Sequence, residues 1–453
     1  MINPTIFKSN DIRGIYPSEL NEEVIYDIAR SFVKYTGVKR VVAARDARVS
    51  ADSLFSSLAK GMSHQSAEVY DIGQTPTECL YFAVGNYDFD AGIMITASHN
   101  PKEYNGLKMI KKNGDSIEII RGKDLLLAMR ESFVRPEGYP APQDENEIFK
   151  KDIWKDYLNH ILSFVDLSEI TPLKIVIDAS SGVAGKVISK IQDKLPVEII
   201  PLNFEPDGNF PNHSPNPLAE GSTDQISERI KKEKADFGLI FDGDADRVFL
   251  IDEEGCFARG DITLLLIAKY FLQKNPGMAI AYNAICSKAV PEFIKKWNGV
   301  PIRTKVGFAD VRAGLIENNG IMGGELSGHY CFKDNFYLDS GMIAFLTLLQ
   351  VISKDGRNVS EIVKELSLYA KSAELNFKIK VPTASPSRIL DEIGKKYSDG
   401  KQDYLDGVTV EYKNWWFNVR ASNTEPLLRL TIEADTQELL KQKQKELSDF
   451  ILK

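Results

Sequence analysis

The amino-acid sequence predicts three homologous α/β domains with mixed sheets, followed by a smaller α+β domain. Three observations lead to this fold class. A chain of 453 residues is too long for one ordinary hydrophobic core, so several domains are expected. An order of β-branched run, loop and helical segment occurs three times along the chain. From residue 374 onward, the order changes to strand, helix, two strands and helix.

The repeated unit begins at residues 40–54, 173–188 and 278–293. Alternation of strands and helices is typical of parallel sheets that are covered by helices. In each unit a third apolar run ends in a polar loop, and open α/β sheets bind ligands beyond the carboxyl ends of their strands. We therefore expect one cleft built from three domains, lined by the loops at residues 96–101, 242–247 and 324–329.

Polar stretches at residues 135–146 and 367–376 are typical of linkers, and a third break lies near residues 253–260. These breaks divide the chain into three α/β domains and a C-terminal α+β domain. Their predicted ranges are residues 1–140, 150–255, 256–368 and 374–453.

The composition, with 43% apolar and 26% charged residues, is that of an average globular protein. A net charge of −8 argues against nucleic-acid or anionic-membrane partners, which require a basic face. The four cysteines contain no CxxC pair, so neither a zinc site nor a disulfide framework is expected. Residues 1–13 lack the apolar core of a signal peptide, and no apolar stretch is long enough to span a membrane. We expect a cytoplasmic protein.

The strongest single signal is a loop that contains Asp242, Asp244 and Asp246 between two apolar runs. Crowded carboxylates raise each other's cost of ionising, so the group requires a cation, and oxygen ligands favour Mg²⁺ or Ca²⁺. An acidic surface turn is the alternative, because Asp-Gly is a common turn dipeptide. An EF-hand is rejected, since its sixth position requires glycine and is Arg247 here, and its flanks would be helices.

Ser98 lies just after an apolar run, in the sequence Thr-Ala-Ser-His-Asn-Pro. A polar turn before Asn-Pro explains an isolated serine best, and His99 points away from it if the backbone is extended. The chain has no Gly-x-Ser-x-Gly elbow for acyl transfer. A phosphorylated serine, however, supplies anionic oxygens that complete a metal site with the three aspartates. The pairing with that loop makes Ser98 a candidate phosphoryl carrier.

Two more loops carry candidate binding residues. Arg420 can form two parallel hydrogen bonds to a phosphate, and it is followed by the short donors Ser422, Asn423 and Thr424. An ordinary hairpin turn explains this loop when it is taken alone.

The loop at residues 324–329 combines a carboxylate and a hydroxyl, which suit vicinal sugar hydroxyls, in Glu325 and Ser327. His329 can exchange protons near neutral pH, and a glycine-flanked turn is the alternative. Arg13 and Lys108 also have simpler explanations, as a salt-bridge partner and a solvated strand residue.

Together these motifs resemble those of the α-D-phosphohexomutases, specifically the bacterial phosphomannomutase/phosphoglucomutase group. The resemblance covers the whole chain in order, through the motifs Asp11–Gly14, Thr96–Pro101, Asn105–Lys108, Asp242–Arg247, Gly324–His329 and Arg420–Pro426. It implies a heart-shaped, four-domain architecture with a mobile fourth domain. It also implies sugar-phosphate substrates and a monomer or weak homo-oligomer.

The resemblance implies that Ser98 is stored as phosphoserine and that its phosphate binds one Mg²⁺ with the three aspartates. The phosphoryl group would pass to the substrate, giving a hexose 1,6-bisphosphate that turns around before its other phosphate returns to Ser98. By the same resemblance, His329 transfers the proton, assisted by Arg13 and Lys108.

Binding roles follow from the resemblance as well. Glu325 and Ser327 would contact the sugar O3 and O4, which glucose and mannose share. The resemblance assigns His99 and Arg247 to substrate binding, and Arg247 would join Lys108 in stabilising the charge of the transferring phosphoryl group. The phosphate that is not transferred would be held by Arg420, Ser422, Asn423 and Thr424.

Three positions depart from the family pattern. Phe308 follows Gly307 where the family often has histidine, and Ile285 replaces a lysine that commonly contacts substrate, with Lys288 nearby as a substitute. Leu326 replaces a methionine, a volume-conserving change that we expect to be mild. The first two departures bear on the sugar preference.

Three alternatives therefore stay open. A phosphoglucosamine mutase usually has Arg-Pro-Ser-Gly-Thr-Glu-Pro where this chain has Ala and Asn at the second and fourth positions. A sugar-phosphate-binding homologue without catalysis would not require Ser98 and the three aspartates. A metal-dependent phosphatase needs a base that positions water, and the sequence offers only His329.

Overall fold

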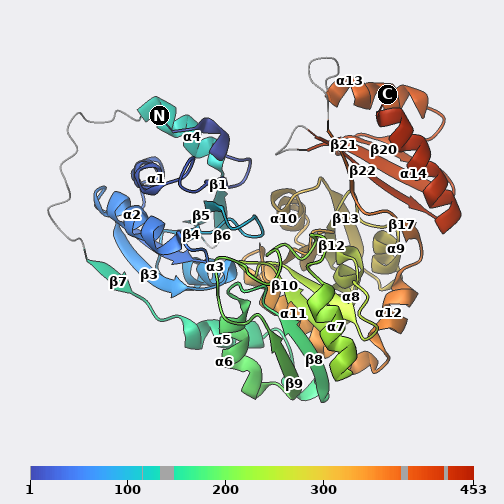
Figure 1. Cartoon of the computed structure of the whole chain (residues 1–453), viewed down its shortest axis with the longest axis horizontal. Coiled ribbons are helices and arrows are strands. Elements are labelled where there is room, and N and C mark those ends of the chain that lie inside the picture. Colours follow the sequence, from blue (N-terminus) through green and yellow to red (C-terminus); the bar gives the residue numbers. More distant parts are fainter. Residues whose placement is uncertain (1, 115, 133–146, 379–385, 423–426, 453) are drawn as a thin grey trace. The chain divides into compact units, whose positions relative to one another are not determined.

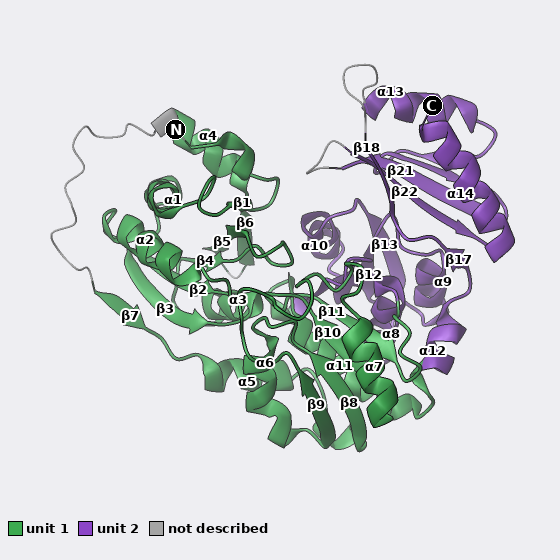
Figure 2. Cartoon of the chain, viewed as in Figure 1, with its two compact units in different colours: residues 1–258, 334–359 green, residues 259–333, 360–453 purple. Residues whose placement is uncertain are grey.

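The structure is a computed structural model, and it describes residues 2–114, 116–132, 147–378, 386–422 and 427–452 (Figure 1). The first predicted linker, residues 135–146, lies outside these residues. The chain forms two compact units (Figure 2). Unit 1 contains residues 1–258 and 334–359, and unit 2 contains residues 259–333 and 360–453.

Unit 1 contains two sheets, and the first has the order β1-β5-β4-β2-β3-β7, with β6 beside β5. Helices α1–α3 accompany this sheet, and α1 begins at the side chain of Asn21, which accepts a hydrogen bond from the N–H of Val24. The elements are β1 (Ile12–Ile15), α1 (Glu22–Thr36), β2 (Arg40–Arg45), α2 (Ala51–Ser63), β3 (Glu68–Gln74), α3 (Thr77–Asn86), β4 (Ala91–Ile95), β5 (Tyr104–Asn113), β6 (Ser116–Ile120), α4 (Gly122–Ser132) and β7 (Ile148–Lys150).

The second sheet of unit 1 has the order β11-β10-β8-β9. Helix α11 returns to it from later in the chain and begins at Ser340, whose hydroxyl accepts from the N–H of Ile343. The remaining elements of unit 1 are α5 (Trp154–Leu162), β8 (Leu173–Asp178), α6 (Ala184–Ile191), β9 (Val197–Leu202), α7 (Asp224–Glu233), β10 (Phe237–Phe241), β11 (Val248–Asp252), β16 (Leu338–Asp339) and α11 (Gly341–Asp355), and β16 is not part of the second sheet.

Unit 2 contains the third copy of the α/β order, in which β13, β12, β14 and β15 lie side by side. A sheet with antiparallel pairs then follows in the C-terminal part, in the order β17-β22-β21-β20-β19 with β18 also beside β22. The elements are α8 (Gly260–Lys274), β12 (Ala279–Asn283), α9 (Ala289–Lys296), β13 (Val300–Thr304), α10 (Phe308–Glu317), β14 (Met322–Gly324), β15 (Tyr330–Phe332), β17 (Ala370–Lys371), β18 (Leu375–Lys378), α13 (Pro386–Lys396), β19 (Lys401–Asp403), β20 (Val408–Glu411), β21 (Trp415–Ala421), β22 (Leu427–Ala434) and α14 (Gln437–Ile451). Helix α12 (Val359–Leu366) lies in the sequence between α11 and β17.

The three copies share one topology. In each, the first strand pairs in parallel with the second and third strands, and the third pairs antiparallel with the strand that follows it. All five residues of β4 and of β10 are buried, as expected for strands covered on both faces. The predicted fold class is therefore confirmed. Among the described residues, no helix is both long and apolar enough to cross a membrane.

Candidate active site

The three aspartates of the predicted metal loop come together in unit 1, directly after β10. Asp242, Asp244 and Asp246 are almost completely buried, and each offers an oxygen within 4.8 Å of those of the other two. Burial rules out an acidic surface turn. The Asp244 Oδ1 atom is buried with no hydrogen-bond donor among the described residues, which leaves an anionic oxygen available to a cation. This set of oxygens fits a hard divalent ion such as Mg²⁺.

Ser98 lies against this group. Its loop leaves β4, the strand that occupies in the first sheet the place of β10 in the second. The Ser98 hydroxyl donates a 2.8 Å hydrogen bond to Asp242 Oδ2 across 144 positions of the sequence. A Cβ atom at Gly243 would lie 2.8 Å from the Ser98 carbonyl oxygen, so glycine permits the two loops to approach.

The backbone at Ser98 is not extended. Its φ of +52° is left-handed, and its N–H donates to the Thr96 hydroxyl at 2.7 Å. As a result, the His99 Nδ1 atom lies 3.2 Å from the Ser98 hydroxyl, whereas an extended backbone would have turned the two side chains apart. The structure thus places both predicted site residues on one side of the loop.

Lys108 provides positive charge next to the carboxylates. It is on β5, and its ammonium contacts Asp246 and donates a 2.7 Å hydrogen bond to Asp244. The alternative explanation of Lys108 as a solvated strand residue is therefore excluded, because the side chain is only 15% exposed. Arg247 adds a second cation, with its Nε atom 3.7 Å from Asp242 and 3.9 Å from Asp246.

Acidity differs sharply within the trio. Burial and the charges of its two neighbours raise the pKa of Asp242 well above its usual value. Burial also acts on Asp244, but hydrogen bonds from Lys108 and Thr77 and the charge of Lys108 outweigh it, so its pKa is lowered. A divalent cation would favour the ionised form of all three groups.

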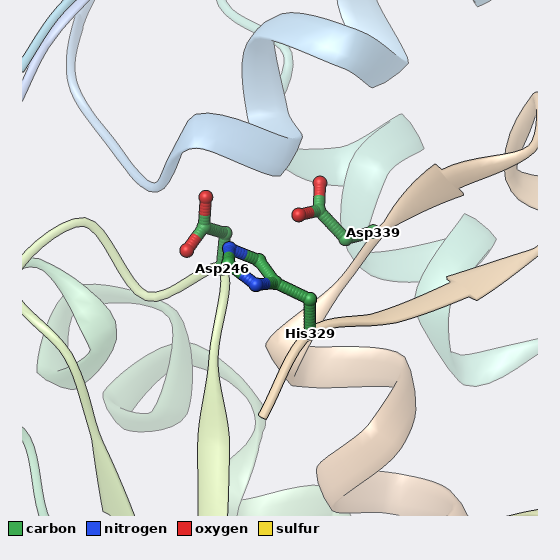
Figure 3. Close-up of side chains that lie close together, drawn as sticks. All are labelled: Asp246, His329 and Asp339. Carbon is green, nitrogen blue, oxygen red and sulfur yellow. The ribbon is translucent and has the colours of Figure 1, made fainter. Parts of the chain in front are cut away.

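Two residues at this site escaped the sequence analysis. Thr77, at the start of α3, donates from its hydroxyl to Asp244 Oδ2 at 2.6 Å. Asp339, at the end of β16, is buried with a carboxylate oxygen within 4.8 Å of Asp246 (Figure 3). Burial and the charge of Asp246 raise the pKa of Asp339 well above its usual value. Neither Thr77 nor Asp339 lies in a recognisable sequence motif. Each contacts an aspartate that is far away in the sequence, so local patterns give no signal for either.

Arg13 is close to the serine loop in the same unit. It is on β1, opposite Gly106 of β5. Its Nη1 atom donates to the carbonyl of Ala97 at 3.2 Å and contacts the side chain of Asn100, while its Nε donates to Asp11 at 2.8 Å. The salt bridge of the simpler explanation is present, and the same side chain also reaches the residue before Ser98.

In unit 2, the loop after β14 brings Glu325, Ser327 and His329 together. Glu325 is buried, accepts from the Ser327 hydroxyl at 3.1 Å and has an oxygen 3.3 Å from His329 Nδ1. The N–H of Gly307 and the side-chain amide of Asn283 donate to its other oxygen. Burial alone would raise the pKa of Glu325, but the hydrogen bond and charge of His329 and the other donors lower it.

Of the positions that depart from the family pattern, Phe308 lies against this loop. The Phe308 ring faces His329, with the ring centroids 5.9 Å apart. Ile285 is buried. The ammonium of Lys288, the suggested substitute for the missing lysine, lies 3.0 Å from Glu411 instead.

Arg420, on β21, is directly opposite Arg429 on β22. The two guanidinium groups share one carboxylate, that of Glu374, at 2.7 Å and 2.9 Å. The N–H of Ser422 donates to the carbonyl of Leu427 at 2.8 Å. Two other predicted phosphate ligands, Asn423 and Thr424, lie outside the described residues.

Comparison with known proteins covers the whole chain. Four phosphoglucomutase/phosphomannomutase family models match in order: alpha/beta/alpha domain I at residues 4–121, domain II at 155–255, domain III at 259–369 and the C-terminal domain at 377–450. The chain is 34% identical to the phosphohexose mutases of Xanthomonas campestris pv. campestris (strain B100), over 98% of each chain. It is 35% identical to the phosphomannomutase of Methanocaldococcus jannaschii, over 99% of this chain and 98% of the relative.

Solved structures agree with these relatives. A phosphoglucomutase/phosphomannomutase family protein from Burkholderia thailandensis matches with a TM-score of 0.87 and 30% identity, over 100% of this chain and 98% of its own. The N-acetylphosphoglucosamine mutase of Aspergillus fumigatus, solved with GlcNAc-6P and magnesium, matches with a TM-score of 0.59 and 14% identity, over 93% of this chain and 79% of its own. The second likeness shows a shared fold only.

Proposed function

This chain belongs to the phosphoglucomutase/phosphomannomutase family and is thus a phosphohexomutase, and we propose that it exchanges a phosphoryl group between Ser98 and a hexose phosphate. The observation that supports this role most directly is the 2.8 Å hydrogen bond from the Ser98 hydroxyl to Asp242, within a buried trio of aspartates. An unmodified serine hydroxyl is uncharged and does not require a metal site beside it. A phosphoserine carries negative charge that a bound cation would neutralise.

The residues that would hold Mg²⁺ are Asp242, Asp244 and Asp246 together with the phosphate of Ser98. When bound, the ion neutralises negative charge on the phosphoryl oxygens and orients them for in-line displacement. Lys108 and Arg247 lie beside the same carboxylates and supply further positive charge. Phosphoryl transfer depends chiefly on such positioning and charge stabilisation.

Two transfers make the proposed reaction. In the first, the bond from phosphorus to Ser98 Oγ breaks as a sugar hydroxyl oxygen bonds to phosphorus; that hydroxyl loses its proton, and Ser98 Oγ takes up a proton and becomes a hydroxyl again. The hexose 1,6-bisphosphate then turns around, and its other phosphate returns to Ser98 Oγ. We propose that His329 accepts the proton that the sugar hydroxyl loses, with Arg13 and Lys108 assisting. His99 lies next to the hydroxyl and contributes to substrate binding.

Sugar recognition is assigned to the loop of unit 2. Contacts from Asn283, Gly307, Ser327 and His329 hold the Glu325 carboxylate. Its pKa is lowered, so the group is ionised and would accept hydrogen bonds from sugar hydroxyls. Contacts to O3 and O4 would accept both mannose and glucose, which differ at O2. Arg420 and Ser422, with Asn423 and Thr424, would hold the phosphate that is not transferred.

A phosphorus NMR time course tests the proposal. Mannose 1-phosphate and glucose 1-phosphate are incubated separately with Mg²⁺ and a trace of glucose 1,6-bisphosphate. We expect both 6-phosphates, and the ratio of the rates gives the sugar preference. The Ser98→Ala protein is the control and should give neither product.

Other outcomes would replace the proposal. Release of inorganic phosphate alone would indicate a phosphatase, and conversion of glucosamine 1-phosphate alone would indicate a phosphoglucosamine mutase. Binding of all three sugar phosphates without conversion would indicate a homologue that has lost catalysis.

A further inference from the structure

The side chain of Arg48 is completely buried under the loop that carries Ser98. Arg48 lies between β2 and α2, fifty positions before that serine. Its Nη2 group donates to the carbonyls of Ser98 and Asn100 at 2.9 Å and 2.6 Å. Its Nη1 group donates to the carbonyls of Pro101 and Tyr104 at 2.8 Å and 2.7 Å.

The fifth donor of this guanidinium, Nε, reaches Asp46 Oδ2 at 3.2 Å. An arginine side chain has five N–H donors and no acceptor, so every donor of Arg48 has an acceptor. Four of the five acceptors belong to the segment 98–104. The backbone carbonyls of residues 98–104 thus bind a guanidinium that is not exposed to solvent.

We propose that Arg48 is a positioning residue for phosphoryl transfer: it holds the backbone of residues 98–104 so that the Ser98 oxygen faces the metal aspartates. This inference rests on the proposed role of Ser98 as phosphoryl carrier. Arg48 touches the carbonyl of Ser98 and no reacting atom, so it acts through the loop.

The loop needs such a support. Ser98 has a φ of +52°, a left-handed conformation that is unfavourable for a residue with a Cβ atom. Arg48 fixes the Ser98 carbonyl on one side of the chain, and the hydroxyl meets Asp242 on the other. Rotation of that peptide toward a relaxed conformation would carry the hydroxyl away from Asp242.

Arg48 is itself fixed by its surroundings in unit 1. Asp46 accepts hydrogen bonds from the Arg48 N–H at 3.0 Å and from the Thr96 hydroxyl at 2.7 Å. The Phe210 ring lies over the guanidinium, with its centroid 5.3 Å from the central carbon. Gly208 allows this close approach, because a Cβ there would lie 2.6 Å from the Cα of Arg48.

The test compares Arg48→Lys with a matched control, Arg45→Lys. Lysine keeps the charge, but its single ammonium cannot bind four carbonyls spread over residues 98–104. Arg45 comes from the same segment, and its side chain forms ion pairs with Asp52 and Asp71, outside the serine loop. Both proteins are treated with glucose 1,6-bisphosphate and Mg²⁺ in single-turnover reactions, and the phosphorylation of Ser98 is followed by intact mass.

We expect Arg48→Lys to slow phosphorylation of Ser98 about 100-fold, since a small misplacement of a reacting group has an effect of that size. The KM for hexose 1-phosphate should change less than about 3-fold, because the side-chain donors of Arg48 are taken up by Asp46 and the serine loop, and the variant keeps the positive charge. Hydrogen exchange of the peptide at residues 98–104 should accelerate in this variant alone. Arg45→Lys should match the wild type in all three measurements.

A rate in Arg48→Lys equal to the wild type, or a loss that matches the fraction of unfolded protein, would overturn the inference. If Arg48→Lys does not fold, Phe210→Leu serves instead, because it removes only the ring over the guanidinium. That variant should slow phosphorylation about 10-fold with hydrogen exchange raised in the same peptide. Failure of the wild type to become phosphorylated would instead refute the role of Ser98, and the inference with it.

Discussion

The aspartate loop of unit 1 and the arginine pair of unit 2 concentrate charge of opposite sign in different ways. Three carboxylates lie together after β10, and the ammonium of Lys108 contacts two of them. Two guanidinium groups lie together across β21 and β22, and one carboxylate, Glu374, contacts both. The aspartates therefore face two cations, Lys108 and Arg247, whereas the two arginines share the carboxylate of Glu374.

The two clusters differ in exposure and in how firmly they are held. The aspartates are buried, and hydrogen bonds from Ser98 and Thr77 fix two of them. In the arginine pair, Arg429 is 26% exposed and Glu374 is 22% exposed. A preformed site binds its ion with little rearrangement, whereas a site that is occupied by its own carboxylate must exchange it for the ligand. The comparison predicts a rigid metal site and a phosphate site that is in competition with Glu374.

The largest expected effect tests the rigid site through Asp242→Asn. Loss of one charged ligand should lower kcat about 1000-fold, because a bound metal contributes several kcal/mol to phosphoryl transfer. The increase in Tm on adding Mg²⁺ should also disappear. In EDTA, the Tm should not fall below that of the wild type, since the raised pKa of Asp242 shows that its ionised form is disfavoured without a cation.

Asp236→Asn is the matched control for this experiment. Asp236 caps the other end of the same strand, where its carboxylate accepts from the N–H of Lys174 at 2.7 Å. It should keep the activity and the Mg²⁺-dependent rise in Tm. A full rise in Tm with Asp242→Asn would mean that the ion binds elsewhere.

The second effect addresses the phosphate site through Arg420→Lys. A lysine cannot form the paired hydrogen bonds of a guanidinium, so KM should rise about 10- to 100-fold while kcat changes much less. Steady-state kinetics with hexose 1-phosphate give both constants. Arg388→Lys, at an exposed position of α13, is the control and should be silent. An unchanged KM would remove Arg420 from substrate binding.

The third effect is a pH-dependent loss of stability in Glu325→Gln. Because the pKa of Glu325 is lowered in the folded protein, its carboxylate contributes stability above the unfolded value of about 4.3, and that stability is lost as the pH falls through the folded value. We expect the variant to lose about 1–3 kcal/mol at pH 7 and progressively less below pH 4. Urea denaturation at several pH values measures this difference.

Glu317→Gln, on the exposed surface of α10, is the control and should be as stable as the wild type at each pH. A difference between Glu325→Gln and the wild type that grows as the pH falls would contradict the assignment of an ionised, well-bonded carboxylate.

The smallest expected effect tests whether Glu374 competes with the substrate phosphate for the two arginines. Glu374→Gln removes the charge that competes with the substrate phosphate, so KM should fall about 3-fold. Glu374 and Arg429 are partly exposed and Arg420 is buried, and glutamine can still accept hydrogen bonds from both arginines, so the change should cost about 1 kcal/mol of stability. A rise in KM would show that Glu374 orients Arg420 for the ligand and does not compete with it.

Signals that are local in the sequence were predicted correctly. The third apolar runs of the first two repeats became β4 and β10, and the polar residues after them became the serine and aspartate loops. Glu325, Ser327 and His329 meet because they alternate within one short loop. Such features depend on neighbours along the chain, so composition and spacing reveal them. The family resemblance added the roles, and the comparisons confirm the family.

Other features depend on contacts between distant segments. Lys108 looks like a solvated strand residue, yet pairing of β5 with β4 places it against Asp244, 136 positions away. The left-handed turn at Ser98 brings His99 to the hydroxyl, contrary to the extended geometry. Arg48 was not identified from the sequence, because four of its acceptors are backbone carbonyls. Every residue has a backbone carbonyl, so residue types give no sign of which carbonyls an arginine will bind.

The sequence by itself thus determined the fold class and the order of strands and helices, and it singled out the candidate residues for the chemistry. Only the tertiary structure decided which of those groups are buried, which charges face one another and which side chain supports the serine loop. The physical reason is that hydrophobic periodicity acts over a few residues, whereas desolvation and charge pairing act between segments that packing alone brings together.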